Sequence, residues 1–228
     1  ELGGKSPNII FEDADLERAV TAGVNHMMGN TGQSCNAPSR MLVHSSVYDK
    51  AVVIAKEAAG NVAVDQPTKE GQHLGPLSSR VQFDKVQGLI EKGIEEGATL
   101  VAGGPGKPKG FETGYFVRPT VFTNVTNEMT IAQEEIFGPV LSMIPFETEE
   151  QAIQIANDTP YGLSAYFSTT SEERAARVAS QLRAGMVSIN SASQDYTAPF
   201  GGYKQSGNGR EWGEFGFDDF LEIKGITV

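Results

Sequence analysis

Hydrophobic and polar positions occur in alternating blocks along the chain, and the spacing of the apolar residues changes from block to block. Short apolar runs bounded by glycine, proline or charged residues are typical of buried strands, whereas apolar residues three and four positions apart indicate helices. These patterns predict strands over 7–11, 40–43, 99–102, 140–146, 163–167 and 186–190. They predict helices over 15–28, 47–59, 78–96, 149–157 and 172–183, the first with Asp15 as its N-cap.

The order of these elements predicts the fold class. Repeated strand–helix–strand succession requires crossover connections, which place the strands parallel. We therefore expect an α/β fold of three layers, a largely parallel sheet with helices on both faces. Ligands in such sheets usually bind beyond the carboxyl ends of the strands, so we expect the functional site there. Two further expectations are a capped helix at the end of the glycine-rich segment 199–213 and a C-terminal strand over 222–228 that could meet a partner.

Length and composition exclude several classes of protein. A chain of 228 residues can bury a large core without disulfides or metals. Its net charge of −11 argues against a nucleic-acid partner, which needs a clustered basic face. No apolar stretch approaches the roughly 18 residues of a membrane span. One cysteine and three scattered histidines make a zinc site improbable, and a lone cysteine fits a reducing compartment, so we expect a cytoplasmic protein without metal.

The single cysteine, Cys35, lies in a loop of small and polar residues, NTGQSCNAPSR over 30–40. Backbone N–H groups in such a loop can point at the sulfur, depress its pKa below the free value of about 8.5 and stabilise a neighbouring oxyanion. The loop alone does not distinguish a nucleophile from an inert thiol. A cysteine hydrolase is disfavoured because His26 falls on the polar side of its helix, and no Asp or Asn is placed to orient His44 or His73.

Three other segments are rich in glycine and acidic residues: ELGGKSPN at 1–8, QEEIFGPV at 133–140 and PFGGYKQSGNGREWG at 199–213. Each taken alone fits a sharp turn with solvated or capping acids. Together with the cysteine loop, in this order, they resemble the aldehyde dehydrogenase superfamily from Glu1 to Val228. The segments that carry the resemblance are ELGGKSPNII, NTGQSC, GYFVRPTVF, EEIFGPV, NDTPYGLSA and PFGGYKQSGNGRE.

The resemblance implies that residues 1–228 form a single catalytic domain, about the C-terminal half of a member. The family's N-terminal cofactor-binding domain is absent from this chain, and no Gly-x-Gly-x-x-Gly segment of that type occurs in it. The asparagine that supplies the family's second oxyanion donor also lies upstream of Glu1. We therefore expect the isolated chain to bind NAD(P) weakly and to turn over little.

The resemblance also implies catalytic roles. Cys35 matches the nucleophile, whose thiolate attacks the aldehyde carbon; the thiohemiacetal then gives hydride to the nicotinamide and leaves a thioester. Glu1 matches the glutamate that activates the water for hydrolysis, a task that partial burial of a carboxylate would favour. Glu211 matches a second, inner glutamate implicated in proton relay.

Cofactor positions follow from the same resemblance. Glu135 matches the residue that hydrogen-bonds the nicotinamide ribose, and Phe137 matches the aromatic residue packed against the nicotinamide. Leu2 and Gly3 match backbone positions beside that ring, where a missing side chain permits close approach. NAD is the expected cofactor, with NADP as the alternative.

The implied substrate is a small-molecule aldehyde, and the expected assembly is a homo-oligomer, a dimer or tetramer. Ser34, Asn36 and Phe200 match positions that line the aldehyde tunnel. The loop SASQDYTA over 191–198 precedes Phe200 and carries no arginine to hold a substrate carboxylate. These features favour aromatic or medium-chain aliphatic aldehydes.

Two alternatives remain open. A member that passes the acyl group to coenzyme A commonly lacks the first-motif glutamate, so Glu1 favours hydrolysis. A non-catalytic fragment that keeps the fold is the other alternative. The intact site positions argue against a degenerate parent protein, although the isolated chain could still be inert.

Overall fold

A seven-stranded sheet forms the centre of the computed structural model, which describes residues 1–228. The strands are β1 (Pro7–Ile10), β2 (Arg40–His44), β3 (Thr99–Ala102), β4 (Thr120–Thr123), β5 (Val140–Phe146), β6 (Ser164–Ser168) and β7 (Met186–Ile189). Their order across the sheet is β3-β4-β5-β2-β1-β6-β7. Every neighbouring pair is parallel except β3 and β4. The predicted largely parallel α/β sheet is confirmed.

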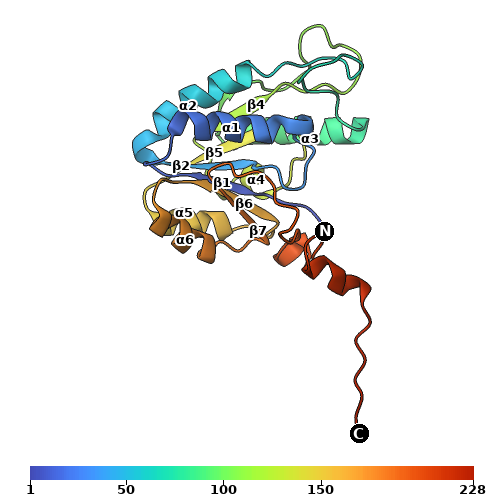
Figure 1. Ribbon diagram of the computed structural model, residues 1–228. Coiled ribbons are helices and arrows are strands. Elements are labelled where there is room, and N and C mark those ends of the chain that lie inside the picture. Colours follow the sequence, from blue (N-terminus) through green and yellow to red (C-terminus); the bar gives the residue numbers. More distant parts are fainter.

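Helices cover both faces of this sheet. They are α1 (Leu16–Met28), α2 (Ser45–Gly60), α3 (Arg80–Glu95), α4 (Thr130–Gln133), α5 (Glu149–Asn157) and α6 (Glu172–Gln181), with 3-10 turns η1 (Gly29–Gly32), η2 (Lys204–Ser206) and η3 (Phe215–Phe220). Helices α1 and α2 lie over one face, and α5 and α6 lie over the other (Figure 1). Asp15 caps α1 as predicted, because its carboxylate accepts the backbone N–H of Arg18.

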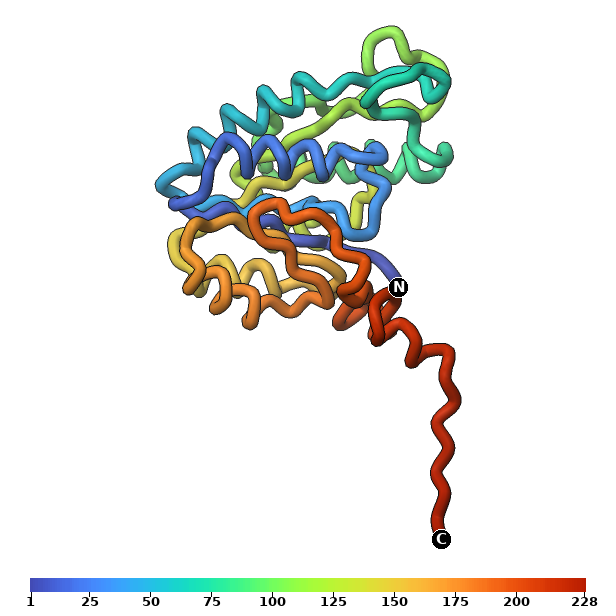
Figure 2. The backbone as a smooth tube through the Cα atoms, viewed as in Figure 1, coloured from blue at the N-terminus to red at the C-terminus, as the bar shows by residue number.

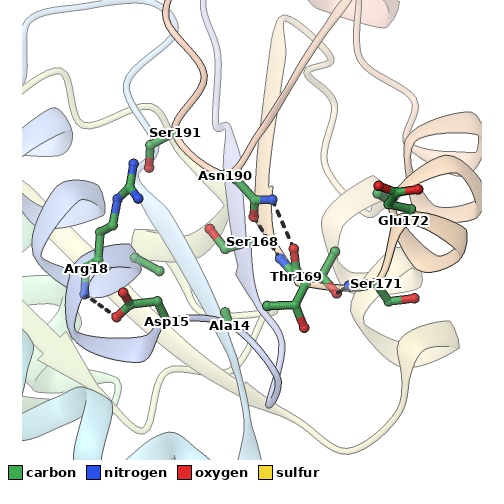
Figure 3. Close-up of a pocket in the computed structure, with 12 residues that line it drawn as sticks. Ala14, Asp15, Arg18, Ser168, Thr169, Ser171, Glu172, Asn190 and Ser191 are labelled. Atoms are coloured by element: carbon green, nitrogen blue, oxygen red, sulfur yellow. Dashed lines mark hydrogen bonds between the residues drawn. The ribbon is translucent and has the colours of Figure 1, made fainter.

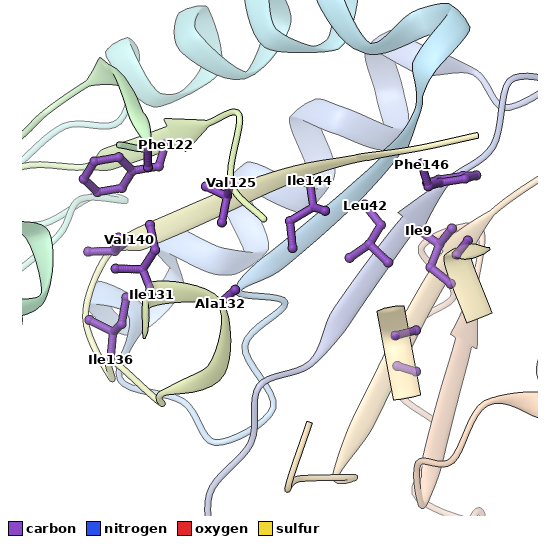
Figure 4. Close-up of a cluster of buried hydrophobic side chains, with 14 of the residues drawn as sticks. Ile9, Leu42, Phe122, Val125, Ile131, Ala132, Ile136, Val140, Ile144 and Phe146 are labelled. Atoms are coloured by element: carbon purple, nitrogen blue, oxygen red, sulfur yellow. The ribbon is translucent and has the colours of Figure 1, made fainter. Parts of the chain in front are cut away.

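The central strands are buried on both faces, so their side chains pack alternately into two separate hydrophobic cores. Ile9 of β1 aligns with Leu42 of β2, which aligns with Ile144 of β5, and all three belong to the larger core (Figure 4). Their sequence neighbour Ile10 points to the opposite face, into the core beneath α1 and α2. This two-sided burial accounts for the continuous apolar runs in the sequence.

Strand β4 was not predicted, because its few apolar residues lie within the segment GYFVRPTVF, which was interpreted only as a family motif. The capped helix expected within 199–213 was wrong: the only helical element there is the three-residue turn η2. Positive φ angles at Gly207, Trp212 and Gly213 break the chain into turns. The strand expected over 222–228 does not form either. Those residues are exposed, make no backbone hydrogen bond and run away from the body (Figure 2).

Candidate active site

The residues that the family resemblance singles out gather at the amino ends of the central strands. Glu1 and Gly3 precede β1, Cys35 precedes β2, and Glu135 precedes β5. Because these three strands are neighbours in the sheet, the loops that lead into them meet. The expectation that these residues lie beyond the carboxyl ends was therefore wrong, since each sits in a loop that enters a strand.

The carboxyl edge holds a different feature, a polar pocket of about 430 Å³ between the first turns of α1 and α6 (Figure 3). Asn190 fixes its wall: its amide accepts the backbone N–H of Thr169 at 3.0 Å and donates to the carbonyl of Thr169 at 3.0 Å. None of the predicted site residues lines this pocket. The predicted site residues thus lie at the amino ends of the strands, whereas this pocket lies at their carboxyl ends.

Cys35 occupies the second position of a tight turn. The turn is closed by the backbone N–H of Ala37, which donates to the carbonyl of Ser34 at 3.1 Å. The chain reaches this turn through left-handed backbone at Thr31 and at Gly32, whose φ is +69°. A β-carbon at Gly32 would also collide with the backbone carbonyl of Gly138, so only glycine fits there.

The Gly-Gly pair of the first motif lies against the other two motifs. The backbone N–H of Gly4 donates to Oε1 of Glu135 at 3.0 Å. A β-carbon at Gly3 would stand 2.6 Å from Oε2 of the same carboxylate, and one at Gly4 would collide with the carbonyl oxygen of Cys35. Without side chains at these two positions, Glu135 and the cysteine turn both pack directly on the first motif.

Helix α3 holds the loop that carries Glu135 and Phe137. Lys85 Nζ donates to the carbonyl of Glu135 at 2.7 Å, and Gln82 Nε2 donates to the carbonyls of Ile136 and Phe137 at 2.9 and 2.8 Å. Phe137 is half-buried and has a φ of +57°, a conformation rare outside glycine. Gln82 and Lys85 were not predicted, because polar residues on a helix face carry no signal of their own.

The carboxyl of Glu1 lies close enough to the thiol of Cys35 to perturb its pKa, so the structure brings together the predicted nucleophile and the predicted base. Burial and the nearby carboxyl of Glu1 raise the pKa of the Cys35 thiol to about 12, against the opposing N–H groups of Asn36 and Cys35 itself. The N–H donors expected in this loop act on the thiol, but burial and Glu1 outweigh their effect on its pKa. Glu1 itself is exposed, so burial does not assist its proposed task as a base in this structure.

Glu211 and Phe200 form a backbone pair, with N–H to carbonyl distances of 2.7 Å in both directions. The Phe200 ring lies 4.8 Å from that of Trp212, which lies 4.9 Å from Tyr196. The Glu211 side chain is exposed, and its carboxylate makes no hydrogen bond within the chain. The structure thus places Glu211 beside an aromatic cluster and leaves its predicted relay role without a direct contact.

The N-terminal segment is fastened to the glycine-rich segment by Ser206, a fully buried residue that the sequence analysis missed. Its hydroxyl donates to the carbonyl of Gly3 at 2.6 Å and accepts the N–H of Gly162 at 3.0 Å. The backbone N–H of Leu2 donates to the carbonyl of Ser206 at 3.1 Å, while the Leu2 side chain is exposed. Through these hydrogen bonds Ser206, which lies outside the sheet, fixes the positions of Leu2 and Gly3.

Two buried cations beside the site were also missed. Arg40, at the start of β2, is fully buried and donates to the carbonyls of Lys5, Ile155 and Ala156 at 3.0, 2.8 and 2.8 Å. Lys5 is 1% exposed, and its Nζ has no hydrogen-bond partner. Burial, together with the nearby charge of Arg40, lowers the pKa of Lys5 to about 7.

Comparison with known proteins gives this arrangement its context. Residues 1–226 match the aldehyde dehydrogenase family. This chain belongs to the aldehyde dehydrogenase family. It is 58% identical over 226 residues to 3-succinoylsemialdehyde-pyridine dehydrogenase from a Pseudomonas species, a match that covers 99% of this chain and 47% of the relative.

Solved aldehyde dehydrogenases share the fold closely. The enzyme from Bartonella henselae superposes with a TM-score of 0.95 at 51% identity, over 97% of this chain and 46% of that one. Aldehyde dehydrogenase C (AldC) from Pseudomonas syringae, solved as a mutant with NAD+ and octanal, gives 0.95 at 50% identity over the same shares. This chain therefore spans about half the length of the aldehyde dehydrogenases that it matches.

This aldehyde dehydrogenase chain has neither a metal-binding cluster nor a helix that could span a membrane. No group of three or more His, Cys, Asp or Glu side chains is arranged to hold a metal ion. No helix is both long enough and apolar enough to cross a membrane.

Proposed function

We propose that this chain supplies the nucleophile and the water-activating carboxylate for the NAD(P)-dependent oxidation of an aldehyde to a carboxylic acid. The observation that carries the proposal is the proximity of the Glu1 carboxyl to the Cys35 thiol, whose pKa it raises, within an aldehyde dehydrogenase fold. A base in contact with a nucleophile is the arrangement that covalent catalysis requires. Glu1 also favours hydrolysis over transfer of the acyl group to coenzyme A.

In the first step, the sulfur of Cys35 attacks the aldehyde carbon as its proton passes to Glu1. A carbon–sulfur bond forms, and the carbonyl π electrons move to oxygen, which gives a tetrahedral thiohemiacetal. The burial that raises the pKa of Cys35 to about 12 keeps the thiol protonated at rest, so the reaction needs the adjacent carboxylate. We assign the backbone N–H of Cys35 as an oxyanion donor, a contact typically worth about 3 kcal/mol.

NAD, when bound, supplies the hydride acceptor. The residues at this site suit its nicotinamide half. Oε2 of Glu135 accepts no hydrogen bond within the chain, which leaves it available to a ribose hydroxyl. Gly3, next to this carboxylate, carries no side chain, and Phe137 is held half-exposed by Gln82. We propose NAD rather than NADP because aldehyde dehydrogenases similar to this chain were solved with NAD+.

After hydride loss has left a thioester on Cys35, Glu1 releases to solvent the proton that it took from the thiol. In the second step, the regenerated carboxylate of Glu1 takes a proton from water, which attacks the thioester carbon. The carbon–sulfur bond breaks, the carboxylic acid leaves, and the proton returns the Cys35 sulfur to the thiol. The exposure of Glu1 gives it direct exchange with solvent. We assign Glu211 to proton transfer at the tunnel, where its backbone is paired with Phe200.

We propose an aromatic or medium-chain aliphatic aldehyde as substrate. The cluster of Phe200, Trp212 and Tyr196 gives the tunnel an aromatic wall, and Ser34 and Asn36 flank the nucleophile. Two relatives support this class. One is named for 3-succinoylsemialdehyde-pyridine, and the other was solved with octanal.

We further propose that residues 1–228 are one catalytic domain of a longer cytoplasmic protein that forms a dimer or tetramer. The shares of the relatives that this chain covers support the longer protein. The adenine half of the cofactor then binds outside this domain, and the isolated chain binds NAD weakly. Isothermal titration tests this, and micromolar affinity of the isolated chain for NAD would contradict it.

The reaction is tested by NADH formation with octanal in the full-length protein that contains this chain. Cys35→Ala should abolish NADH formation. Glu1→Gln should slow both the first turnover and steady turnover, because Glu1 takes the proton of Cys35 before hydride loss and activates water after it. Faster steady turnover upon addition of coenzyme A would favour the acylating alternative instead.

A further inference from the structure

Tyr166 of β6 reaches the cysteine turn from the sheet. Its hydroxyl donates to the backbone carbonyl of Asn36 at 2.9 Å. The ring is half-buried and meets the edge of His26 from α1, with ring centroids 5.0 Å apart and planes at 80°. Tyr166 is therefore fixed by two elements of the body while its hydroxyl holds the residue next to Cys35.

The peptide unit between Asn36 and Ala37 is bonded on both sides. Its carbonyl accepts from Tyr166, and its N–H closes the turn by donating to Ser34 at 3.1 Å. A peptide unit held at both polar groups cannot rotate without the loss of a hydrogen bond. The Tyr166 hydroxyl thus fixes the plane of the turn in which Cys35 occupies the second position.

That orientation matters to the sulfur. The backbone N–H groups of Cys35 and Asn36 lower the pKa of the Cys35 thiol and so favour its thiolate form. Both groups belong to the turn that Tyr166 holds. If the turn were free to rotate, these donors would point at the sulfur for only part of the time.

We propose that Tyr166 is a positioning residue for Cys35: its hydroxyl holds the turn so that the two amides stay aimed at Sγ. The inference rests on the proposed function only in taking Cys35 as the nucleophile. Burial raises the pKa of Tyr166 to about 12, with a further contribution from the nearby Cys35, so the hydroxyl remains a donor at neutral pH. The charged or titratable groups that face this cluster are Glu1 and His26.

The test is the rate of Cys35 alkylation in the 228-residue chain, measured for the wild type and for Tyr166→Phe at several pH values. The single cysteine makes the product unambiguous by intact mass. Below the thiol pKa the rate follows the thiolate fraction, so a rate ratio at fixed pH reports a shift in pKa. Two neutral reagents of different size, iodoacetamide and N-ethylmaleimide, separate this shift from a change in access.

Tyr48→Phe is the matched control. Tyr48 is buried in α2, where its hydroxyl donates to the carbonyl of Met143 at 3.1 Å and accepts the N–H of Asn124 at 2.9 Å. The Tyr48→Phe variant loses hydrogen bonds of the same kind, and Tyr48 does not contact the cysteine turn. Thermal unfolding of both variants shows whether each keeps the fold.

We expect Tyr166→Phe to alkylate roughly threefold more slowly than the wild type at each pH, by the same factor for both reagents, while Tyr48→Phe matches the wild type. An unchanged or faster rate in Tyr166→Phe would overturn the proposal, as would slowing with the larger reagent alone or equal slowing in the control. Alkylation needs neither cofactor nor aldehyde. Its outcome is therefore independent of whether the protein oxidises aldehydes.

Discussion

The backbone N–H of Gly4 lies 3.0 Å from Oε1 of Glu135, a residue 131 positions later in the chain. This bond joins the segment that enters β1 to the loop that enters β5, across the cysteine turn that enters β2. The contact exists because neither Gly3 nor Gly4 carries a side chain. The glycines of the first motif therefore provide space for residues of the other two.

Gly4→Ala should destabilise the chain by about 1–3 kcal/mol, since the new β-carbon would collide with the carbonyl of Cys35. Gly88→Ala is the control, because Gly88 lies in α3 with no atom near the new methyl group. That change should stabilise the chain by about 0.5–1 kcal/mol. Urea unfolding measures both, and equal effects would contradict the close packing of Gly4 on the cysteine turn.

Arg40→Met should lower the free energy of unfolding by about 3 kcal/mol or more, because it leaves buried hydrogen-bond acceptors without a donor. These are the carbonyls of Lys5, Ile155 and Ala156 and the Asn127 side chain. Arg40→Lys keeps the charge but cannot reach all four acceptors, so it should recover only part of the loss. Full stability in either variant, measured by denaturant unfolding, would contradict this role.

Asp13 predicts a dependence of stability on acid pH. Burial alone would raise the pKa of its carboxyl, but hydrogen bonds from Thr169 and Thr170 and the charge of Arg174 lower the pKa to about 2. Because the folded pKa lies below the unfolded value of 3.8, the contribution is present above pH 3.8 and is lost as the pH falls through 2.

Asp13→Asn should therefore lower the unfolding free energy by about 2 kcal/mol at neutral pH, with a smaller effect as acid is added. Urea unfolding at a series of acid pH values measures the difference between the two proteins. A difference that stays constant down to pH 2 would show that Asp13 contributes no pH dependence.

The buried Lys5 predicts a dependence of stability on pH in the neutral to alkaline range. Its folded pKa of about 7 lies below the unfolded value of 10.5, so the folded state gives up a proton more readily. Stability should rise as the pH increases from 7 to 10.5 and should be lowest below pH 7, where a buried, unpartnered ammonium must persist.

Lys5→Met should stabilise the chain below neutral pH by about 1–4 kcal/mol, and this gain should shrink toward alkaline pH. Lys56→Met, on the exposed side of α2, is the control and should show a flat difference across the same range. A flat difference for Lys5→Met as well would mean that the amine finds a partner on protonation.

Local patterns predicted the layers of this fold well, because each strand and helix carries its own periodicity. Strand β5 and helix α5 begin and end at the predicted residues. The C-terminal segment failed because a strand needs a neighbour, and Ile223 and Ile226 have none in this chain. The sequence of a segment does not show whether a neighbouring strand is available to pair with it.

The site divides in the same way. The motifs identified Cys35, Glu1 and Glu135, and the structure brings them to one edge of the sheet. The supporting contacts of Tyr166 and Ser206 were not predictable, because a hydroxyl on a strand or in a turn gives no sign of which distant carbonyl it will meet. The raised pKa of Cys35 was not predictable for a related reason: burial is a property of the whole fold.

Trp212 is the only tryptophan of the chain, and its ring lies 4.8 Å from Phe200 and 4.9 Å from Tyr196. Its fluorescence therefore originates at the aromatic wall and from nowhere else in the molecule. A compound that displaces Phe200 or excludes water from this cluster changes the emission without any attached label. The protein thus carries its own optical reporter at the place where the proposed substrate would enter.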